Sequence, residues 1–139
     1  MVAFIFMIFF STPIAEPTVH HAKDDSLSLT VIADLVQSAD GAIYMELSDQ
    51  TGKAVSAVKV AIKEKKAEWT FRQVPPGKWA VRLYHDENDN GKLDTNFFGI
   101  PTEGYGFSNN VQGRFGPPSF DRRLFEIQND TTITIYLIY

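Results

Sequence analysis

The residues best suited to chemistry stand together in one segment of the chain, HDENDNGKLD. Its side-chain oxygens fall at alternate positions, on Asp86, Asn88 and Asn90, and again on Asp94. Gly91 follows the third of them, where a cation-binding loop turns sharply. Alternate residues on a tight turn direct their oxygens toward one point, and Ca²⁺ takes six to eight such oxygen ligands. The spacing therefore predicts a calcium site.

The remaining ligands of this loop follow from the same spacing. Lys92 stands where an EF-hand loop uses a backbone carbonyl, so its charge need not enter the site. Phe97 stands where an EF-hand has its bidentate glutamate, and Glu103 is the nearby acid that would complete the shell. A metal-free turn, held by Asn and Asp side chains bonded to the backbone, is the alternative. If calcium binds, few carboxylates imply a dissociation constant of about 10⁻⁴–10⁻³ M.

His85 begins the same segment and raises the question of catalysis. It stands beside Asp86, with Glu103 and Ser108 nearby in sequence, and such groups supply general bases in enzymes. The chain has no nucleophile elbow, no phosphate-cradling glycine loop and no histidine-rich metal triad. We therefore assign no catalytic residue, and we predict that His85 is a hydrogen-bonded structural residue, with ligand binding as its alternative role.

Aromatic residues dominate the rest of a long stretch between Tyr84 and Phe120. Because Phe97, Phe98 and Phe115 favour burial over solvation, we expect an ordered loop that is packed by its own aromatic side chains. Glycines alternate with Tyr105 and Phe107, which permits close backbone contacts. We expect these two rings to pack inward over the core. Turned outward, they would form a stacking platform for a sugar or a peptide.

The elements that must position this stretch are strands. Apolar residues alternate with polar ones, which is typical of half-buried strands, and no segment keeps a helical period. Turn-forming residues separate the segments every 8–12 residues, which favours an all-β sandwich. We expect a single antiparallel sandwich of about seven strands within residues 27–139, at residues 27–35, 42–47, 58–62, 68–74, 79–84, 124–127 and 132–139.

The beginning of the chain and its composition indicate an exported protein. Residues 1–10, MVAFIFMIFF, have the length of a signal-peptide core and are too short to span a bilayer. We predict a signal peptide over residues 1–15 and a flexible leader over residues 16–26, so that no stable membrane span remains after cleavage. The chain has no cysteine, and a net charge of −4 disfavours nucleic-acid binding.

Three strings give the chain a family resemblance over residues 27–139. The strings VPPGKWAV, HDENDNGKLDTNFFGIPTEGYGFSNN and FGPPSF resemble the bacterial domain-of-unknown-function family 2141. The resemblance implies a small secreted or periplasmic protein with a prealbumin-like β-sandwich, related to Ig-like folds. It departs at Arg122 and Arg123, where the family has a small residue. A fold is implied in this way, and a function is not.

Together these observations predict a secreted or periplasmic, non-enzymatic β-sandwich module. Its calcium-stabilised loop would present a binding surface to a protein or glycan, with His85, Tyr105 and Phe107 as candidate contacts. One alternative is a periplasmic enzyme that uses His85 and the loop carboxylates. Another is an assembly subunit that pairs with its partner through an edge strand, residues 132–139.

Overall fold

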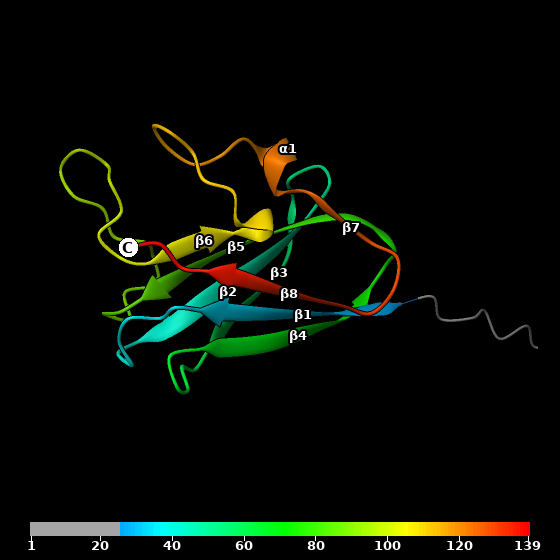
Figure 1. The fold of residues 1–139 in the computed structure, drawn as a ribbon, viewed down its shortest axis with the longest axis horizontal. Coiled ribbons are helices and arrows are strands. Elements are labelled where there is room, and N and C mark those ends of the chain that lie inside the picture. Colours follow the sequence, from blue (N-terminus) through cyan, green and yellow to red (C-terminus); the bar gives the residue numbers. More distant parts are fainter. Residues whose placement is uncertain (1–25) are drawn as a thin grey trace, which may run out of the picture.

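The computed structural model describes residues 26–139, which form a β-sandwich (Figure 1). The predicted signal peptide and residues 16–25 of the predicted leader, with His20 and His21, lie outside the described residues. The elements in chain order are the strands β1 (Leu27–Asp34), β2 (Ala42–Asp49), β3 (Ala54–Val60), β4 (Ala67–Val74), β5 (Gly77–Asp86) and β6 (Tyr105–Phe107), the short helices η1 (Ser108–Asn110) and α1 (Phe120–Arg123), and the strands β7 (Phe125–Ile127) and β8 (Thr131–Tyr136).

Two sheets make the two layers. The smaller has the order β4-β1-β8, and the larger has the order β3-β2-β5-β6, with β7 also paired to β5. Among the described residues, no helix is long and apolar enough to cross a membrane. The all-β prediction is thus confirmed in its coarse form, as a sandwich-like arrangement of eight strands in two sheets.

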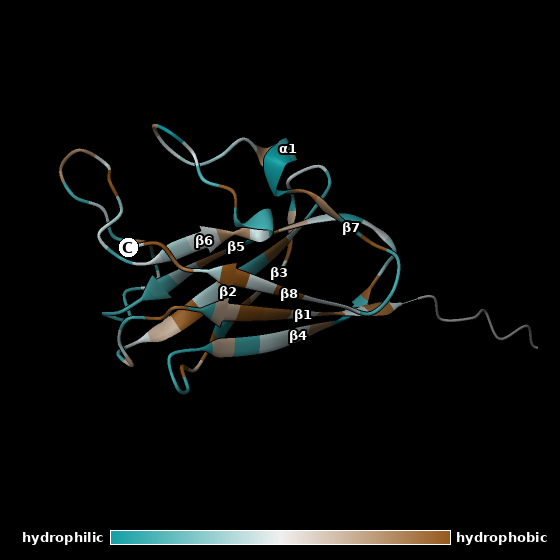
Figure 2. Cartoon of the chain, viewed as in Figure 1, coloured by the Kyte–Doolittle hydropathy of each residue, from teal (hydrophilic) through white to brown (hydrophobic). Residues whose placement is uncertain are grey.

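The core lies between the two sheets, where the alternating apolar residues meet. Figure 2 shows hydrophobic residues recurring along β1, β2 and β8. Successive side chains of a strand point to opposite faces, so alternating apolar residues make one face of the strand entirely apolar. The largest core side chains with no more than 1% exposure are Leu29, Val31, Val36, Ile43, Met45, Val81, Ile127 and Ile135.

Two features of the sheets differ from the sequence expectation. The first is β6, which lies inside the stretch where we expected no strand and pairs with residues 82–84 of β5. The second is the pairing of β1 with β8, which is parallel and not antiparallel. Both strands start at the same end of the sandwich, where the Ser28 N–H donates to the Asp130 carboxylate at 2.8 Å. Alternation sets which face is buried, but it carries no information on strand direction.

The two sides of the sandwich differ in what borders their edge strands. On one side, the Asn110 side-chain amide pairs with the free edge of β8, donating to the Thr134 carbonyl and accepting from the Tyr136 N–H. On the other side, the edge strands β3 and β4 leave a groove of about 720 Å³ between them. Trp69 and Trp79 both line this groove. Among the described strands, β3 and β4 are thus the edge strands that border this groove.

Candidate functional site

The candidate site begins where β5 leaves the sheet, at Asp86. This carboxylate is 1% exposed and organises the turn that follows it. Its Oδ1 accepts the Asn90 N–H at 3.0 Å, and its Oδ2 accepts the Gly91 N–H at 2.9 Å. Gly91 adopts a φ of +80°, a conformation that suits glycine. The turn predicted from the spacing is therefore present, with Asp86 at its centre.

Two further polar side chains of the loop, those of Asn88 and Asn90, converge on the Asp94 carboxylate. Asn88 donates its amide to Asp94 Oδ2 at 2.6 Å. Asn90 donates to both oxygens of Asp94, at 2.9 and 2.8 Å. An amide presents nitrogen or oxygen to the same point after a half-turn of its terminal torsion. Four of the predicted ligands thus belong to one turn, and three of them are in direct contact.

The same contacts perturb the titration of Asp94. Hydrogen bonds from Asn90 and Asn88 hold the pKa of Asp94 below its ordinary value of 3.8. A lowered pKa in the folded state means that folding favours the ionised carboxylate. The stability that this carboxylate contributes is therefore complete above pH 3.8 and is lost as the pH falls through the lower, folded-state pKa.

A measurable acid sensitivity follows from this carboxylate. We expect the difference in unfolding free energy between the native chain and an Asp94→Asn variant to shrink as the pH falls below about 4. The variant lacks the titrating group, so its stability follows only the remaining acids. Urea unfolding at a series of pH values measures the difference. A difference that is independent of pH would contradict the role given to Asp94.

Glu103 lies beneath the loop and joins its two halves. Its side chain comes from the segment just before β6 and is 5% exposed. Glu103 Oε1 accepts the Glu87 N–H, and Oε2 accepts the Asp94 N–H, both at 2.9 Å. Hydrogen bonds to a charged acceptor are about twice as strong as neutral ones. Glu103 is thus a buried clasp of the loop, a role that the spacing alone did not indicate.

The loop suits a hard cation that accepts mixed oxygen ligands. Within residues 26–139, no three His, Cys, Asp or Glu side chains lie close enough to hold a metal ion by themselves. A cation here would therefore depend on amide and carbonyl oxygens, from Asn88, Asn90 and Lys92, besides carboxylates. Ca²⁺ accepts this ligand mixture, whereas zinc prefers nitrogen and sulfur. Both oxygens of Asp86 and Glu103 already accept backbone N–H groups, and each retains a lone pair.

His85 faces the core and not a cleft. Its ring is 0% exposed, and its Nε2 lies 2.7 Å from the Asp40 carbonyl. Because a carbonyl only accepts, Nε2 carries the proton, and Nδ1 accepts from the Tyr139 hydroxyl at 2.8 Å. The Tyr139 oxygen in turn accepts the Gln37 N–H at 3.0 Å. The Glu87 carboxylate lies 3.6 Å from Nδ1, which carries no proton in this tautomer. With both nitrogens occupied, His85 has no atom free to bind a ligand or move a substrate proton.

Tyr139 reaches His85 because the residue beneath its ring is a glycine. A Cβ at Gly104 would lie 2.4 Å from Tyr139 Cζ, closer than atoms can approach. The Gly104 carbonyl also accepts the His85 N–H at 2.7 Å. Burial raises the pKa of Tyr139 above its ordinary value. The role of Tyr139 was not predicted, because nothing in the spacing pairs residues that far apart.

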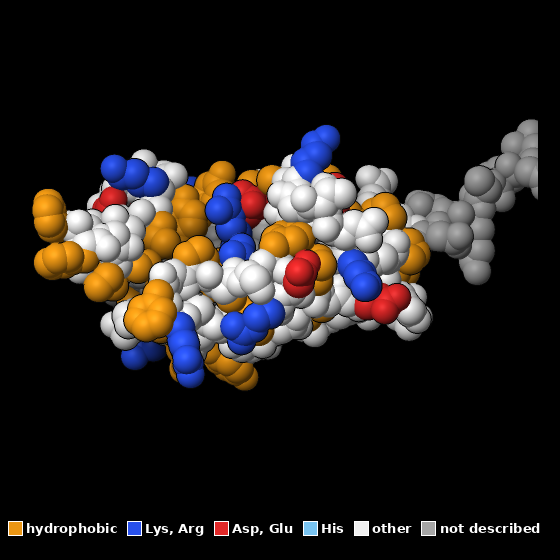
Figure 3. Space-filling model, turned by 90° about the horizontal axis from the view of Figure 1, so that it is seen from above, with side chains coloured by type: hydrophobic (Ala, Val, Ile, Leu, Met, Phe, Trp, Pro, Cys, Tyr) orange, Lys and Arg blue, Asp and Glu red, His pale blue; other side chains and the backbone are white. Residues whose placement is uncertain are grey.

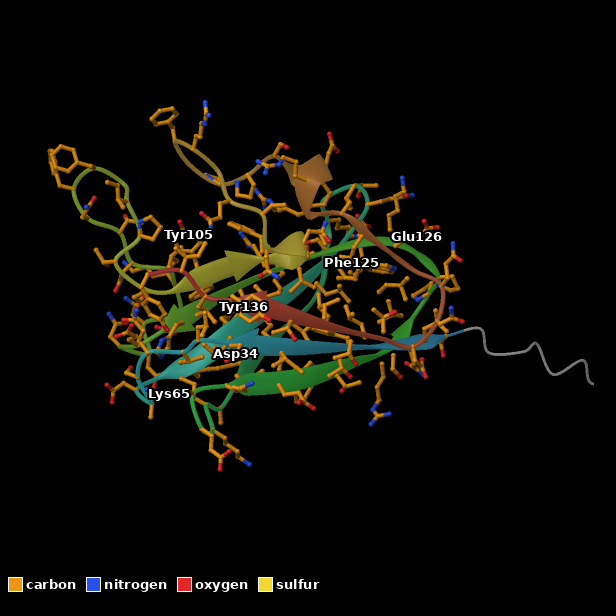
Figure 4. The ribbon with its side chains drawn as sticks, in the orientation of Figure 1. Asp34, Lys65, Tyr105, Phe125, Glu126 and Tyr136 are labelled. Atoms are coloured by element: carbon orange, nitrogen blue, oxygen red, sulfur yellow. The ribbon has the colours of Figure 1, made fainter. Side chains whose placement is uncertain are left out.

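Tyr105 and Phe107 lie on the outer face of the larger sheet, opposite to our expectation. Tyr105 pairs with Tyr84, and Phe107 pairs with Arg82, two outward positions of β5. The intervening Gly106 faces inward, where a Cβ would lie 2.6 Å from Ile135 Cγ2. Both rings are half-buried, and Figure 4 shows Tyr105 beside the base of the projecting loop.

These two rings extend an aromatic row across the outer face. The Tyr44 and Tyr84 rings stack at 5.2 Å between centroids, and the Tyr105 and Phe107 rings meet edge to face at 6.1 Å. The Arg123 guanidinium lies 4.5 Å from the Phe107 centroid. This row forms a half-exposed aromatic surface next to the loop. Such surfaces stack on planar or apolar groups of a ligand.

The prediction that the loop packs through its own phenylalanines is wrong for three of them. Phe97 is 98% exposed, Phe98 is 82% exposed and Phe115 is 102% exposed. Polar groups hold the stretch together instead. Ser108, for example, is fully buried and bonds to the backbones of Val81 and Arg123. Composition did not indicate which side chains of the stretch are buried.

Comparison with known proteins places the chain in a bacterial family. A search of curated proteins finds no match. The family model described as "Uncharacterized protein conserved in bacteria (DUF2141)" matches residues 30–134, which include both sheets, the loop clasped by Glu103 and the aromatic row. The match extends over more than half of the chain and confirms the resemblance seen in the sequence. This protein is a member of the DUF2141 family.

Proposed function

We propose that this protein is a secreted or periplasmic, non-enzymatic β-sandwich module whose loop 86–94 binds Ca²⁺. The bound cation would fix the loop beside the outer aromatic row and so present a binding surface to a protein or glycan. Tyr105 and Phe107 are the proposed contacts on that surface. The arrangement of the sheets would be the prealbumin-like variant of the sandwich that the family resemblance implies.

One observation carries the calcium proposal, namely that Asn88 and Asn90 both direct their amides to Asp94. A cation at this point would turn the amide oxygens of Asn88 and Asn90 inward, in place of the NH₂ groups that now face Asp94. The backbone that brings them together is already fixed by the Asp86 turn and the Glu103 clasp. Because the backbone of the loop is already fixed, cation binding would order few further residues, and the entropic cost of binding is therefore small.

Calcium should therefore stabilise the protein in a saturable manner. At 100 times its dissociation constant, a cation that binds only the folded state raises the free energy of unfolding by about 2.7 kcal/mol. We expect the melting temperature to rise with CaCl₂ in the millimolar range and to return on addition of EGTA. Differential scanning calorimetry in a non-chelating buffer measures this rise, with MgCl₂ and NaCl as ionic controls.

A matched pair of variants assigns the effect to the proposed ligands. Asp94→Asn removes a ligand charge with little change in shape, so it should abolish most of the calcium response. Asp89→Asn removes a charge from the same loop, but Asp89 pairs with Lys59 outside the proposed ligand set, so the response should persist. If the two variants respond to calcium alike, or if the native chain shows no rise, the proposal is wrong.

Two observations favour this proposal over the alternatives. The enzyme alternative needs His85 as a base, and both of its ring nitrogens are already hydrogen-bonded inside the core. The assembly alternative needs a free edge on β8, and the Asn110 side chain pairs with that edge. Export remains part of the proposal on the strength of the apolar run at the start of the sequence.

A further inference from the structure

Apolar side chains project into solvent from two neighbouring loops. The first loop follows the proposed calcium loop and carries Phe97, Phe98 and Ile100, with Ile100 59% exposed. The second loop lies between η1 and α1 and carries Phe115. Both loops extend from the side of the molecule that bears β6, away from β4 (Figure 1). We call these four side chains, three phenylalanines and Ile100, the aromatic tips.

The first tip is a hydrogen-bonded turn whose two phenylalanine rings are exposed to solvent. Residues 96–99 form a turn closed by the Gly99 N–H, which donates to the Asn96 carbonyl at 2.9 Å. The Asn96 side-chain oxygen also accepts the N–H groups of Phe98 and Ile100. Phe97 and Phe98 are thus the two central residues of a turn that Asn96 holds from within. Central turn positions normally carry Gly, Pro, Asn, Asp or Ser, so two phenylalanines there are unusual.

The second tip lies on a bend over residues 114–117. A Cβ at Gly113 would lie 1.8 Å from the Gly116 carbonyl oxygen, so the chain closes a tight turn that only glycine permits at residue 113. Arg114 and Phe115 are its central residues. Arg122 anchors the base of the loop by donating to the Gln112 carbonyl at 3.0 Å. Two separate turns therefore hold aromatic rings outward by backbone geometry.

The near-complete exposure of these rings indicates which class of partner they could bind. A ring that is almost fully exposed lies on a projection, with no surrounding surface of its own. Figure 3 shows hydrophobic side chains gathered at the projecting end of the molecule, with basic side chains nearby. A protein interface needs a contiguous packed patch, whereas a lipid layer accepts separate protruding rings and headgroup phosphates accept nearby cations. Arg114 is an exposed cation of the second loop, and Lys92 is an exposed cation of the neighbouring calcium loop.

We propose that the aromatic tips insert into the interfacial layer of a phospholipid membrane, with Arg114 against headgroup phosphate. The protein would then lie on the membrane by its loops, with the sandwich body in water. This peripheral attachment depends on the tips alone, and it goes beyond the calcium-dependent binding surface proposed above.

A tryptophan placed at a tip tests the proposal on the full chain. Phe97→Trp puts the reporter at the first tip, and Val55→Trp puts it at a 52% exposed position on β3 as the matched control. Each is mixed with phosphatidylethanolamine–phosphatidylglycerol vesicles whose acyl chains carry bromine, which quenches tryptophan only on close approach. Trp69 and Trp79 give both reporters the same background. We expect a blue shift and quenching for Trp at residue 97 and neither for Trp at residue 55.

This design separates the tips from other membrane-seeking parts of the chain. If residues 1–10 alone hold the chain on vesicles, both reporters stay unquenched, and the proposal is overturned. Adding Phe98→Ser and Phe115→Ser to the residue 97 reporter should raise the lipid concentration for half-maximal quenching about tenfold or more, because each apolar side chain contributes on that order. Unchanged quenching would overturn the proposal.

Calcium and self-association are controlled within the same experiment. Titrations are run in CaCl₂ and in EGTA, and quenching in either condition supports the tips even if the calcium site fails its own calorimetric test. A second copy of the chain is the competing occupant. If sedimentation shows an oligomer that Phe97→Ser/Phe98→Ser dissolves, while vesicles leave the residue 97 reporter unquenched, the tips bind protein and the lipid proposal is wrong.

Discussion

Replacing Gly104 by alanine is expected to lower the free energy of unfolding by about 3 kcal/mol. The added Cβ would lie 2.4 Å from the Tyr139 ring, so the ring must move. The ring cannot move cheaply, because its hydroxyl donates to His85 and accepts from the Gln37 N–H. Displacement leaves the buried Nδ1 of His85 without its partner, and a buried group without a partner costs about 1–3 kcal/mol.

A double-mutant cycle identifies the cause of this loss. Tyr139→Ala removes the ring, so Gly104→Ala in that background should change stability by less than about 0.5 kcal/mol. The coupling energy between the two sites would then be about 2–3 kcal/mol. Urea unfolding, followed by the fluorescence of Trp69 and Trp79, measures all variants. Strict additivity of the two substitutions would contradict the steric account.

Replacing Glu103 by alanine is expected to lower the free energy of unfolding by about 4 kcal/mol. The substitution removes the hydrogen-bond acceptor of two backbone N–H groups, those of Glu87 and Asp94. Each of them donates to a Glu103 carboxylate oxygen at 2.9 Å. Glu103→Gln should cost about half as much, because its amide oxygen serves one N–H while its NH₂ opposes the other. Amide hydrogen exchange at residues 87 and 94 should accelerate in both variants.

The control for this prediction is another glutamate on the same sheet. Glu126 is exposed on β7, so Glu126→Ala should change stability by no more than about 0.5 kcal/mol. Glu103→Ala should also lower the calcium response, since the clasp fixes the backbone beneath Asp94. A loss below about 1 kcal/mol for Glu103→Ala, with unchanged exchange at residues 87 and 94, would show that the clasp contributes little.

Most of the strands could be predicted from the alternation of apolar and polar residues, because a strand with one buried face has an apolar residue at every second position. The patterns around Val31, Met45 and Leu83 predicted β1, β2 and β5, and all three side chains are buried. β6 escaped prediction because it is short and has Gly106 at its centre, and glycine weakens any strand signal. Its pairing depends on the closeness of Ile135 to Gly106, a contact between distant parts of the chain.

The site was predictable to the extent that its groups are local in sequence. Spacing alone grouped Asp86, Asn88, Asn90 and Asp94, because one turn determines where alternate side chains point. Glu103 was named as a ligand candidate, but its bonds to two backbone N–H groups required the three-dimensional path of the loop. The exposed phenylalanines were misjudged because hydrophobicity predicts burial only where the backbone can bring the side chain to a core.

The parallel pairing of β1 with β8 has a consequence for the order of folding. The two strands lie at opposite ends of the described chain, and the bond from Ser28 to Asp130 joins residues 102 positions apart. Contacts of such long sequence separation slow folding, because the entropy of closing the chain is lost before the contacts form. The small sheet therefore stays incomplete until β8 has been synthesised. Under the proposed export, this delay would keep the chain unfolded long enough to be threaded through a translocation channel.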